Sequence, residues 1–324
     1  MPTVSVVIPT YNRAQIVLDT VDSVLAQTYR DFELIVVDDG STDNTRETLQ
    51  KYGDRIRYVY KENGGVSDAL NYGINLAEGE WIGILGSDDT WLPQKLEIQM
   101  RDIAAHPEIV LHTTNAMTFR KHLGNSEKNY FQLVGYPILK DEFRIIERPL
   151  ENQVVFGLAW AQCALVRRDA LEKSGLFDRQ MSLYEDQDLY CRLALEGNWA
   201  VRNTPLARIE RKGDPEENLS QKFSNAPIEA RTNFLYSYSK LLTEPRLTSR
   251  EKWVLHHALA EQKSDIAFEY IHRGNLPAGR RELRDALHHE FSFKTVAKYL
   301  AAYLPAGLSL RLRSGWQTLR QRNQ

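Results

Sequence analysis

The sequence predicts an α/β protein with a doubly wound, mostly parallel sheet, followed by an all-α region. Short apolar runs alternate with stretches of helical spacing through the first half of the chain, as in proteins built from strand–helix–strand units. Several of these runs end at Gly, Ser or Asp, and from Pro227 onward the pattern is wholly helical. Because right-handed crossovers bring the strand-to-helix turns to one edge of a parallel sheet, we expect a polar ligand site there.

The individual elements follow from apolar periodicity and turn residues. In the first half, strands are expected at 4–8, 32–37, 56–60 and 81–85. Helices are expected at 14–27 and 66–76, together with one that ends at Leu49 and one that begins at Pro93. Further strands are expected at 112–120, 163–166 and 199–208, and helices at 231–242, 251–273 and 278–289. This pattern predicts a first domain at 1–212, a linker at 213–226 and a helical domain at 227–324 with a basic amphipathic end.

Composition excludes several classes of protein. The 324 residues are 42% hydrophobic and 26% charged, and the formal net charge of -2 gives no reason to expect nucleic acid as a partner. The two cysteines, Cys163 and Cys191, lie far apart without metal-ligand spacing, which is typical of a reduced cytoplasmic setting. The chain start is not that of a signal peptide, and no apolar run reaches the ~18 residues of a membrane span. We therefore expect a cytoplasmic protein that is soluble or peripheral to a membrane.

The stretch IGILGSDD at 82–89 is the most informative turn. A short apolar run stops at Gly86 and delivers Asp88 and Asp89 to the carboxyl end of a strand, where open α/β sheets bind ligands. Hard oxygen ligands suit Mn²⁺ or Mg²⁺, and such an ion suits a diphosphate. The alternatives are two solvated acids in a loop, or an Asp that caps the next helix. No G-x-x-x-x-G-K-[ST] loop or G-x-G-x-x-G turn is present, so P-loop and dinucleotide sites are not favoured.

Five segments in this order closely resemble the family 2 inverting glycosyltransferases, which have the GT-A fold. They are VSVVIPTYNR (4–13), ELIVVDDGSTDNT (33–45), GGVSDALNYGI (64–74), ILGSDD (84–89) and YEDQDLYCRL (184–193). Each segment is weak alone, but five in the right order are specific, and they cover about the first two-thirds of the chain. The resemblance implies a nucleotide-sugar donor, typically UDP-linked, a site at the strand carboxyl ends, and an inverted product.

The resemblance also implies roles for individual residues in donor binding. Pro9, Thr10 and Tyr11 would line the pocket for base and ribose, and Asp39 would accept a hydrogen bond from the nucleobase, typically uracil. Asn71 would help to hold the diphosphate or the sugar. Leu70 stands where some relatives carry Arg, so a phosphate contact from that position is not available.

The Asp-x-Asp metal motif of the family appears here as Ser87-Asp88-Asp89. Its first acid is therefore a Ser, which is a common variant in the family. The resemblance implies that Asp89 is the ligand of a divalent cation, Mn²⁺ or Mg²⁺, and that Asp88 lies near the ribose.

The candidate catalytic bases are Glu185, Asp186 and Asp188, because an acceptor hydroxyl is a poor nucleophile until a base takes its proton. If Asp186 opens a helix, it shares a face with Tyr190, while Asp188 points about 200° away. The family places its base at the Asp of the Glu-Asp pair, which is Asp186 here. The alternative is that three acids in a first helical turn complement the helix dipole.

The acceptor side is less defined. Aromatic residues within 121–162 could stack on an acceptor sugar or form a satellite core beneath a loop, and Trp160 is the preferred acceptor contact. The polar stretch at 211–220 reads as a loop. Related enzymes close a loop here over the diphosphate with a His or basic residue. Arg211 and Lys212 could do so, but the His is absent, and a solvated linker is the alternative.

The C-terminal third has no sequence pattern that indicates a catalytic or metal site. Its histidines lack carboxylate or Cys partners at ligand spacing, so we expect solvated or core histidines. Residues 294–324 combine an apolar stripe with basic residues, which is typical of a helix lying on an anionic membrane, here the inner face of the plasma membrane. Packing against the catalytic domain or against a second subunit is the alternative.

The predicted function is sugar transfer to a glycan or lipid-linked glycan in surface polysaccharide or glycolipid assembly. Two rivals stay open. A sugar nucleotidyltransferase would need a Gly-rich basic phosphate loop after the first strand, where PTYNR stands. An inactive GT-A-like scaffold would not need Asp39, Asp89 and Asp186 together.

Overall fold

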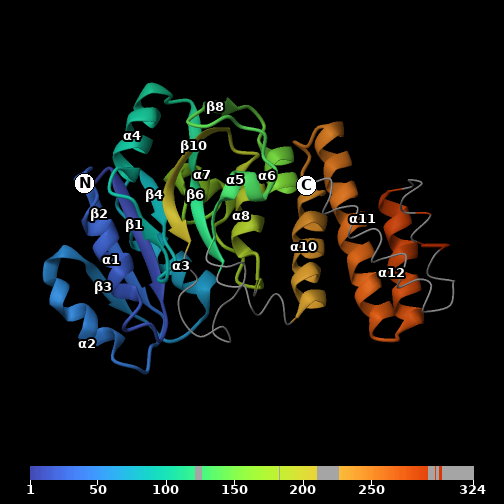
Figure 1. Cartoon of the computed structure of the whole chain (residues 1–324), viewed down its shortest axis with the longest axis horizontal. Helices are drawn as coiled ribbons and strands as arrows, with labels where there is room; N and C mark the ends of the chain where they lie inside the picture. The colour runs from blue at the N-terminus through green and yellow to red at the C-terminus, as the bar shows by residue number, and fades with distance from the viewer. Residues whose placement is uncertain (121–125, 182, 210–225, 291–295, 297–298, 301–324) are drawn as a thin grey trace. The chain divides into compact units, whose positions relative to one another are not determined.

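The structure is a computed structural model that describes residues 1–324 except 121–125, 182, 210–225, 291–295, 297–298 and 301–324. The chain divides into two compact units, Met1–Asn218 and Leu219–Gln324 (Figure 1). The division falls inside the stretch for which a linker was expected. The domain bounds 1–212 and 227–324 stay a prediction.

The first unit is built on one mixed sheet with strand order β3-β2-β1-β4-β9-β6-β10-β5. Its strands are β1 (Val4–Thr10), β2 (Phe32–Asp38), β3 (Arg57–Tyr60), β4 (Trp81–Ile84), β5 (Thr90–Trp91), β6 (Ile109–Arg120), β7 (Ser126–Asn129), β8 (Phe143–Ile146), β9 (Ala164–Arg167) and β10 (Asn198–Ile209). Its helices are α1 (Val17–Leu25), α2 (Thr45–Leu49), the 3₁₀ helix η1 (Gln50–Arg55), α3 (Val66–Leu76), α4 (Lys95–Ala105), α5 (Tyr130–Leu133), α6 (Leu150–Phe156), α7 (Arg168–Ser174) and α8 (Glu185–Leu193).

The α/β prediction is confirmed, but the sheet is mixed: β6 and β10 pair in parallel, as do the first four strands, and the other pairs are antiparallel. β3, β2, β1 and β4 are parallel neighbours. β9 then runs antiparallel to both β4 and β6, and β5 and β8 run antiparallel to β10. A parallel neighbour requires a crossover helix between the two strands. β9 instead follows a long segment after β6 that contains β7, α5, β8 and α6. The periodicity of the sequence predicted none of these four elements.

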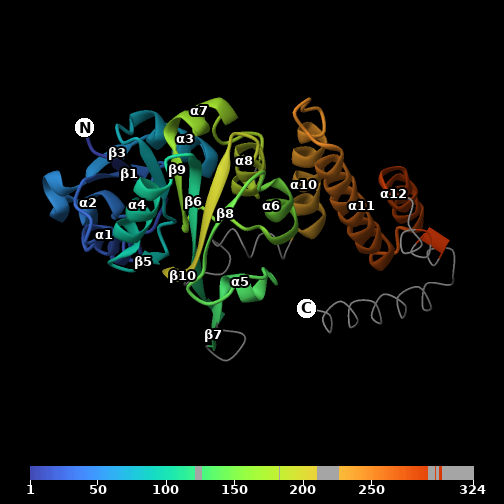
Figure 2. The same cartoon turned by 90° about the horizontal axis from the view of Figure 1, so that it is seen from above.

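Helices cover both faces of this sheet. Figure 2 shows α3 and α7 on one face and α1 and α4 on the other. α3 lies close to the strands because Gly73 has no side chain: a Cβ there would stand 2.4 Å from Val7 Cγ1 and 3.0 Å from Val37 Cγ2. The strands beneath have a largely apolar interior, with Val6, Val7 and Ile8 at 0% exposure, as expected for a sheet covered on both faces. This packing fixes the turns at the carboxyl ends of β1, β2 and β4.

The second unit consists, in its described residues, of the helices α10 (Pro227–Leu241), α11 (Ser249–His272) and α12 (Leu276–His289). α11 begins with a capping box, in which Thr248 and Glu251 satisfy each other's backbone N–H groups. Phe268, Ile271 and Leu283 form the apolar contact between α11 and α12. The expected helices are therefore confirmed to within a few residues.

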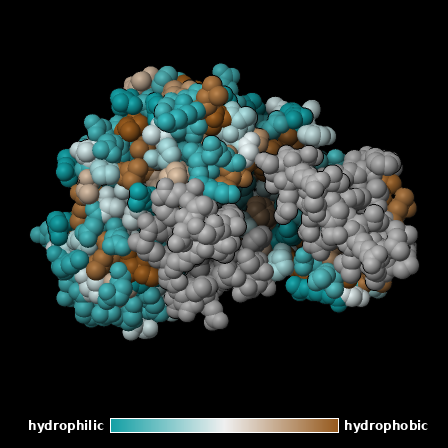
Figure 3. All heavy atoms as spheres, viewed as in Figure 1, coloured by the Kyte–Doolittle hydropathy of each residue, from teal (hydrophilic) through white to brown (hydrophobic). Residues whose placement is uncertain are grey.

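No helix in the described ranges combines the length and apolarity that a membrane span requires. On the face shown in Figure 3, apolar side chains of the first unit stand in small groups separated by hydrophilic ones. The expected membrane-binding stretch, 294–324, lies almost entirely outside the described residues.

Candidate functional site

The turn after β1 ties together the turns after β2 and β4. Thr10 O accepts from Asp39 N at 2.9 Å, and Asn12 N donates to Ser41 Oγ at 2.9 Å. In the other direction, Arg13 Nη1 lies 3.6 Å from Asp88 Oδ2. The segment Thr10–Arg13 therefore brings the second and fourth strand ends to one edge of the sheet, as the doubly wound pattern predicted.

The three residues expected around base and ribose sit at this edge. Pro9 pairs in register with Val37, and Tyr11 is 48% exposed, so its ring is available for a ligand. Thr10 is buried, and within the described residues its hydroxyl has no hydrogen-bond partner. An orphaned buried hydroxyl costs free energy unless a ligand or water satisfies it, which supports a polar ligand here.

Asp39 is held in place by three donors. Lys61 Nζ lies 2.6 Å from Oδ1, Gly64 N donates to Oδ1 at 3.0 Å and Gly65 N donates to Oδ2 at 2.8 Å. Gly65 has a φ of 86°, a backbone conformation that favours glycine. A carboxylate accepts about four hydrogen bonds. Asp39 therefore keeps one acceptor position for a base N–H, whereas its neighbour Asp38 is fully buried beneath Ser41 N and the Tyr58 hydroxyl.

The metal motif forms a small cradle at Gly86. A Cβ on Gly86 would lie 3.3 Å from Asp88 Oδ1, 3.4 Å from Asp89 Oδ2 and 3.4 Å from Gln162 Nε2. Three polar groups thus surround one point, and a Cβ there would make close contacts with all three. The backbone of Asp89 is fixed on two sides, by Asp89 N to Gly86 O at 3.1 Å and by the Thr20 hydroxyl to Asp89 O at 2.8 Å.

This donor set fits Mg²⁺ or Mn²⁺ in the way that nucleotide enzymes hold them. The described residues contain no cluster of three His, Cys, Asp or Glu side chains suited to a metal. Mg²⁺ bound with a nucleotide, however, uses one or two carboxylates, with water and phosphate oxygens as the other ligands. Asp89, with Asp88 beside it, supplies that number. The expectation that Asp89 holds the cation stays a prediction.

Asn71 has a different environment from the one expected for a donor contact. Its Nδ2 donates to Phe177 O at 2.8 Å, and its Oδ1 accepts from Phe177 N at 2.9 Å. Both ends of the buried amide therefore pair with one backbone residue, which fastens α3 to the segment after α7. These two hydrogen bonds give Asn71 a positioning role, and its expected contact to diphosphate or sugar stays a prediction.

The helix α8 presents the acids expected to include the base. Asp188 is buried in an ion pair with Arg192 at 2.6 Å, which makes it structural. Glu185 and Asp186 have no cationic partner among the described residues, and both keep some exposed surface. Tyr184, which precedes them, has a φ of 62°, a conformation that costs ~1–3 kcal/mol in a non-glycine residue and is common at active sites.

Glu185 and Asp186 form an electrostatically coupled pair. Burial, together with the charge of Asp186, raises the pKa of Glu185 to about 8. Burial also raises the pKa of Asp186, although the backbone N–H of Gln187, which donates to Oδ1 at 2.7 Å, opposes the shift. A raised carboxyl pKa makes the group a better proton acceptor once it is ionised, as a general base requires.

The turn from Trp160 to Cys163 lies between the metal motif and this acid pair. Gln162 faces Asp88 and Asp89 across the Gly86 cradle. Trp160 stacks on Tyr130 with ring centroids 4.1 Å apart. Burial raises the pKa of Tyr130 well above its usual value, and the charges of Cys163 and Asp186 add to this effect. The Tyr130 hydroxyl donates to Gly157 O at 2.5 Å, and a Cβ on Gly157 would lie 3.8 Å from Gln187 Oε1, so Tyr130 connects the turn to α8.

Buried polar side chains donate hydrogen bonds to the backbone carbonyls of this turn. Lys95, in the first turn of α4, donates to Cys163 O at 3.3 Å and stands 4.3 Å from the centre of the Trp91 ring. Gln99 Nε2 also donates to Cys163 O at 3.2 Å, and Trp91 Nε1 donates to Gln162 O at 2.7 Å. Two consecutive carbonyls are therefore fixed, and the Gln162 side chain is held toward the acids.

Gln162 and Arg13 are site residues that sequence reasoning missed. Gln162 follows an irregular segment, and no pattern marks it. Its carboxamide has no hydrogen-bond partner within the described residues. Arg13 belongs to the motif VSVVIPTYNR, so a cation next to the first strand end was a signal that could have been used.

Trp160 and Arg211 were the residues expected on the acceptor side, together with a group of aromatic residues. Trp160 is partly exposed and stacks on Tyr130, and its role as acceptor contact stays a prediction. Tyr130, Phe131 and Tyr136 are 5%, 1% and 7% exposed and pack ring against ring, so these aromatics form a satellite core. Arg211 lies outside the described residues.

Comparison with known proteins agrees with this geometry. Residues 5–175 match the family described as "Glycosyl transferase family 2". An uncharacterized glycosyltransferase of Rickettsia typhi is 36% identical over 192 residues, which are 58% of this chain and 58% of that protein. The chondroitin synthase of Pasteurella multocida is 40% identical over 119 residues, 36% of this chain and 12% of that protein. The match thus spans less than two-thirds of either relative.

The structural likeness extends further along the chain. The S. aureus protein TarS, residues 1-349, in complex with UDP-GlcNAc is 18% identical, with a TM-score of 0.71 over 97% of this chain and 92% of that chain. At this identity the likeness shows the fold, which is that of the GT-A enzymes.

Proposed function

Because the chain belongs to glycosyl transferase family 2, we propose that it transfers a sugar from a UDP-sugar to an acceptor hydroxyl, with inversion at the anomeric carbon. The observation that carries the proposal is the arrangement of two acidic groups around one turn. Asp88 and Asp89 meet Gln162 at the Gly86 cradle, and Tyr130, which stacks on Trp160 of that turn, donates to Gly157 O beside Gln187 of the helix that carries Glu185 and Asp186.

In this proposal the first two strand ends bind the nucleoside. Asp39 accepts a hydrogen bond from the base, Tyr11 covers its face, and the orphaned Thr10 hydroxyl finds its partner on the ribose. Asp88, beside Arg13, lies next to the ribose and the first phosphate. The complex of the structurally similar TarS with UDP-GlcNAc supports a uridine donor.

A divalent cation on Asp89 would neutralise charge on the departing diphosphate, which is worth several kcal/mol. The side chains of this protein supply the rest. Arg13 and Gln162 flank the same point and can donate to phosphate oxygens. Asp186 takes the proton from the attacking hydroxyl, and burial keeps its pKa raised, which favours that transfer. With a single displacement, the product configuration is inverted.

We propose a glycan or lipid-linked glycan as the acceptor, in surface polysaccharide or glycolipid assembly at the cytoplasmic face of a membrane. The likeness to a chondroitin synthase supports a polysaccharide. The basic amphipathic pattern at 294–324 supports a peripheral membrane contact.

Donor hydrolysis tests the proposed activity without knowledge of the acceptor. The full chain is incubated with a panel of UDP-sugars and Mn²⁺, and the released sugar is followed by ¹H NMR. We expect slow hydrolysis of one UDP-sugar, its loss on chelation, and first release of the anomer opposite to that of the donor. Release of the same anomer would contradict the inverting mechanism, and hydrolysis of no UDP-sugar would contradict the UDP donor.

Replacing Gln162 with Ala tests the cradle. Since a hydrogen bond to a charged group contributes ~1.5–3 kcal/mol, we expect the affinity for UDP with Mn²⁺ to fall by about 10- to 100-fold. Calorimetric titration with UDP measures this. Gln50→Ala, an exposed glutamine in η1, is the matched control and should bind like the wild type. Equal affinity in Gln162→Ala would remove this residue from the site.

A further inference from the structure

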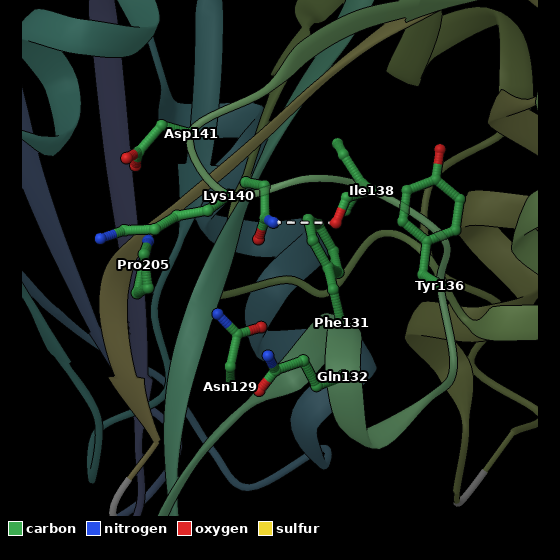
Figure 4. A pocket seen from close by; sticks show the side chains of 9 residues that line it. Asn129, Phe131, Gln132, Tyr136, Ile138, Lys140, Asp141 and Pro205 are labelled. Carbon is green, nitrogen blue, oxygen red and sulfur yellow. Dashed lines mark hydrogen bonds between the residues drawn. The ribbon is translucent and has the colours of Figure 1, made fainter. Parts of the chain in front are cut away.

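A second cavity lies beside β7 and α5, apart from the strand ends that bind the nucleoside in the proposed function. It has a volume of about 240 Å³, and its lining includes Asn129, Phe131, Gln132, Lys140, Asp141 and Asn203 (Figure 4). No motif in the sequence pointed to it, because its walls come from the irregular segment at 129–141 and from β10.

Buried asparagines build one wall of this cavity. Asn115, fully buried on β6, uses its single Nδ2 to donate to both Asn129 Oδ1 and Asn203 Oδ1. Its own Oδ1 accepts from Phe131 N at 3.1 Å. Asn203 Nδ2 in turn donates to Leu139 O at 2.7 Å and to Ile138 O at 3.2 Å. The wall is therefore fixed before any ligand arrives.

Polar groups on the rim are left for a ligand. Within the described residues, Gln132 and Lys140 have no side-chain partner and both are exposed. Asn129 commits only its Oδ1, so its Nδ2 is available. Figure 4 shows the Asn129 and Gln132 amides side by side, with Phe131 next to them, and Lys140 above them with its amine directed away from these amides. Asp141 on the rim has a φ of 57°, the kind of backbone strain that clusters at ligand sites.

This lining suits a neutral polyhydroxylated ring. Side-chain amides donate and accept, so they match hydroxyl groups, and Phe131, Tyr136 and Pro205 supply an apolar wall for ring carbons. A phosphate would find one Lys opposed by the neighbouring Asp141, which is a poor anion site. The volume admits a single sugar ring.

We propose that this cavity is a subsite for one pyranose residue of the acceptor glycan. The inference rests on the proposed function and adds where the acceptor lies. Asn129 directly precedes Tyr130, which stacks on Trp160 and donates to Gly157 O, next to Gln187 of the helix that carries Asp186. A glycan held in the cavity therefore has a short path along α5 and Trp160 to the acid pair.

The test uses the full chain with UDP and Mn²⁺, and two probes, methyl β-D-glucopyranoside and methyl N-acetyl-β-D-glucosaminide. Saturation-transfer NMR reports binding of each probe. The variant is Gln132→Ala/Lys140→Ala, which changes only exposed side chains without partners in the described structure. Since the variant removes two hydrogen-bonding side chains, we expect at least one probe to bind the wild type and to lose about 30-fold in affinity in the variant. Gln50→Ala should bind the probe normally.

Two readouts separate this inference from the proposed function. UDP binding and donor hydrolysis should be the same in the double variant and the wild type, because neither side chain touches the donor site. Binding of neither probe to the wild type, or equal binding in the double variant, would overturn the subsite. Failure of the wild type to bind UDP would instead contradict the proposed function.

Discussion

Replacing Asp186 with Asn is expected to lower turnover by ~10²–10⁴ while UDP-sugar binding stays intact. The amide keeps the shape of the side chain but cannot take a proton from the acceptor hydroxyl. Donor affinity should not change, because in the proposed function Asp186 meets the acceptor rather than the nucleotide. Steady-state transfer rates and calorimetric titration with UDP measure the two effects.

Asp169→Asn is the matched control for this variant. Asp169 also lies in the first turn of a helix, but its carboxylate pairs with Arg167 at 2.6 Å and with Lys173 at 3.1 Å on the surface. A partly exposed ion pair contributes ~0–1 kcal/mol to stability, so activity should be unchanged. Near-normal transfer by Asp186→Asn would rule out Asp186 as the base.

Replacing Asp89 with Asn should abolish the Mn²⁺ dependence of donor binding. A neutral amide is a weak ligand for a hard cation, so the contribution of the ion, several kcal/mol, is lost from the diphosphate. Titration with UDP at increasing Mn²⁺ should show a steep rise in affinity for the wild type and a flat response for the variant.

Two further variants locate the effect of Asp89. Asp88→Asn should weaken UDP binding less, because Asp88 is expected beside the ribose and Arg13 rather than on the cation. Asp54→Asn, an exposed acid in η1, should behave as the wild type. If Asp89→Asn keeps the full response to Mn²⁺, the cation is held elsewhere. Because Asp89 is buried, the melting temperatures of all variants are measured to check that the substitutions have not disturbed folding.

The strand–helix units of the first half could be predicted because their signals are local. Residues 66–76 were predicted as a helix and α3 has those bounds, since Gly64 and Gly65 make the turn that begins it. The turns at Asp39 and Asp89 were found for the same reason: each follows a buried apolar run that ends abruptly. Local period and turn chemistry are thus enough to place the strand ends.

What could not be predicted depends on contacts between distant segments. The antiparallel entry of β9 next to β4 is set by how the segment from 121 to 163 folds, which leaves no period in the sequence. Lys95 looks like a surface residue at a helix start, yet it is fully buried between Trp91 and the Cys163 carbonyl. Burial lowers its pKa to about 7, so its charge is much less favoured than in water.

Side-chain amides were the hardest residues to assign. Asn71 belongs to a motif and was expected to contact the donor, but its amide forms hydrogen bonds with the backbone N and O of Phe177. Gln162 belongs to no motif, but it faces the metal acids. An amide can satisfy a backbone or a ligand equally well, and only its partners in space decide between the two.

A crystal structure of the full chain with UDP and Mn²⁺ tests the central claim most directly, namely that Asp39, Asp89 and Asp186 act on one nucleotide sugar. We predict uracil against Asp39, the cation on Asp89 with both phosphates, and Asp186 on the side of the β-phosphate where the sugar would be attached. UDP bound at another surface, or Asp186 facing away from the diphosphate, would contradict the account.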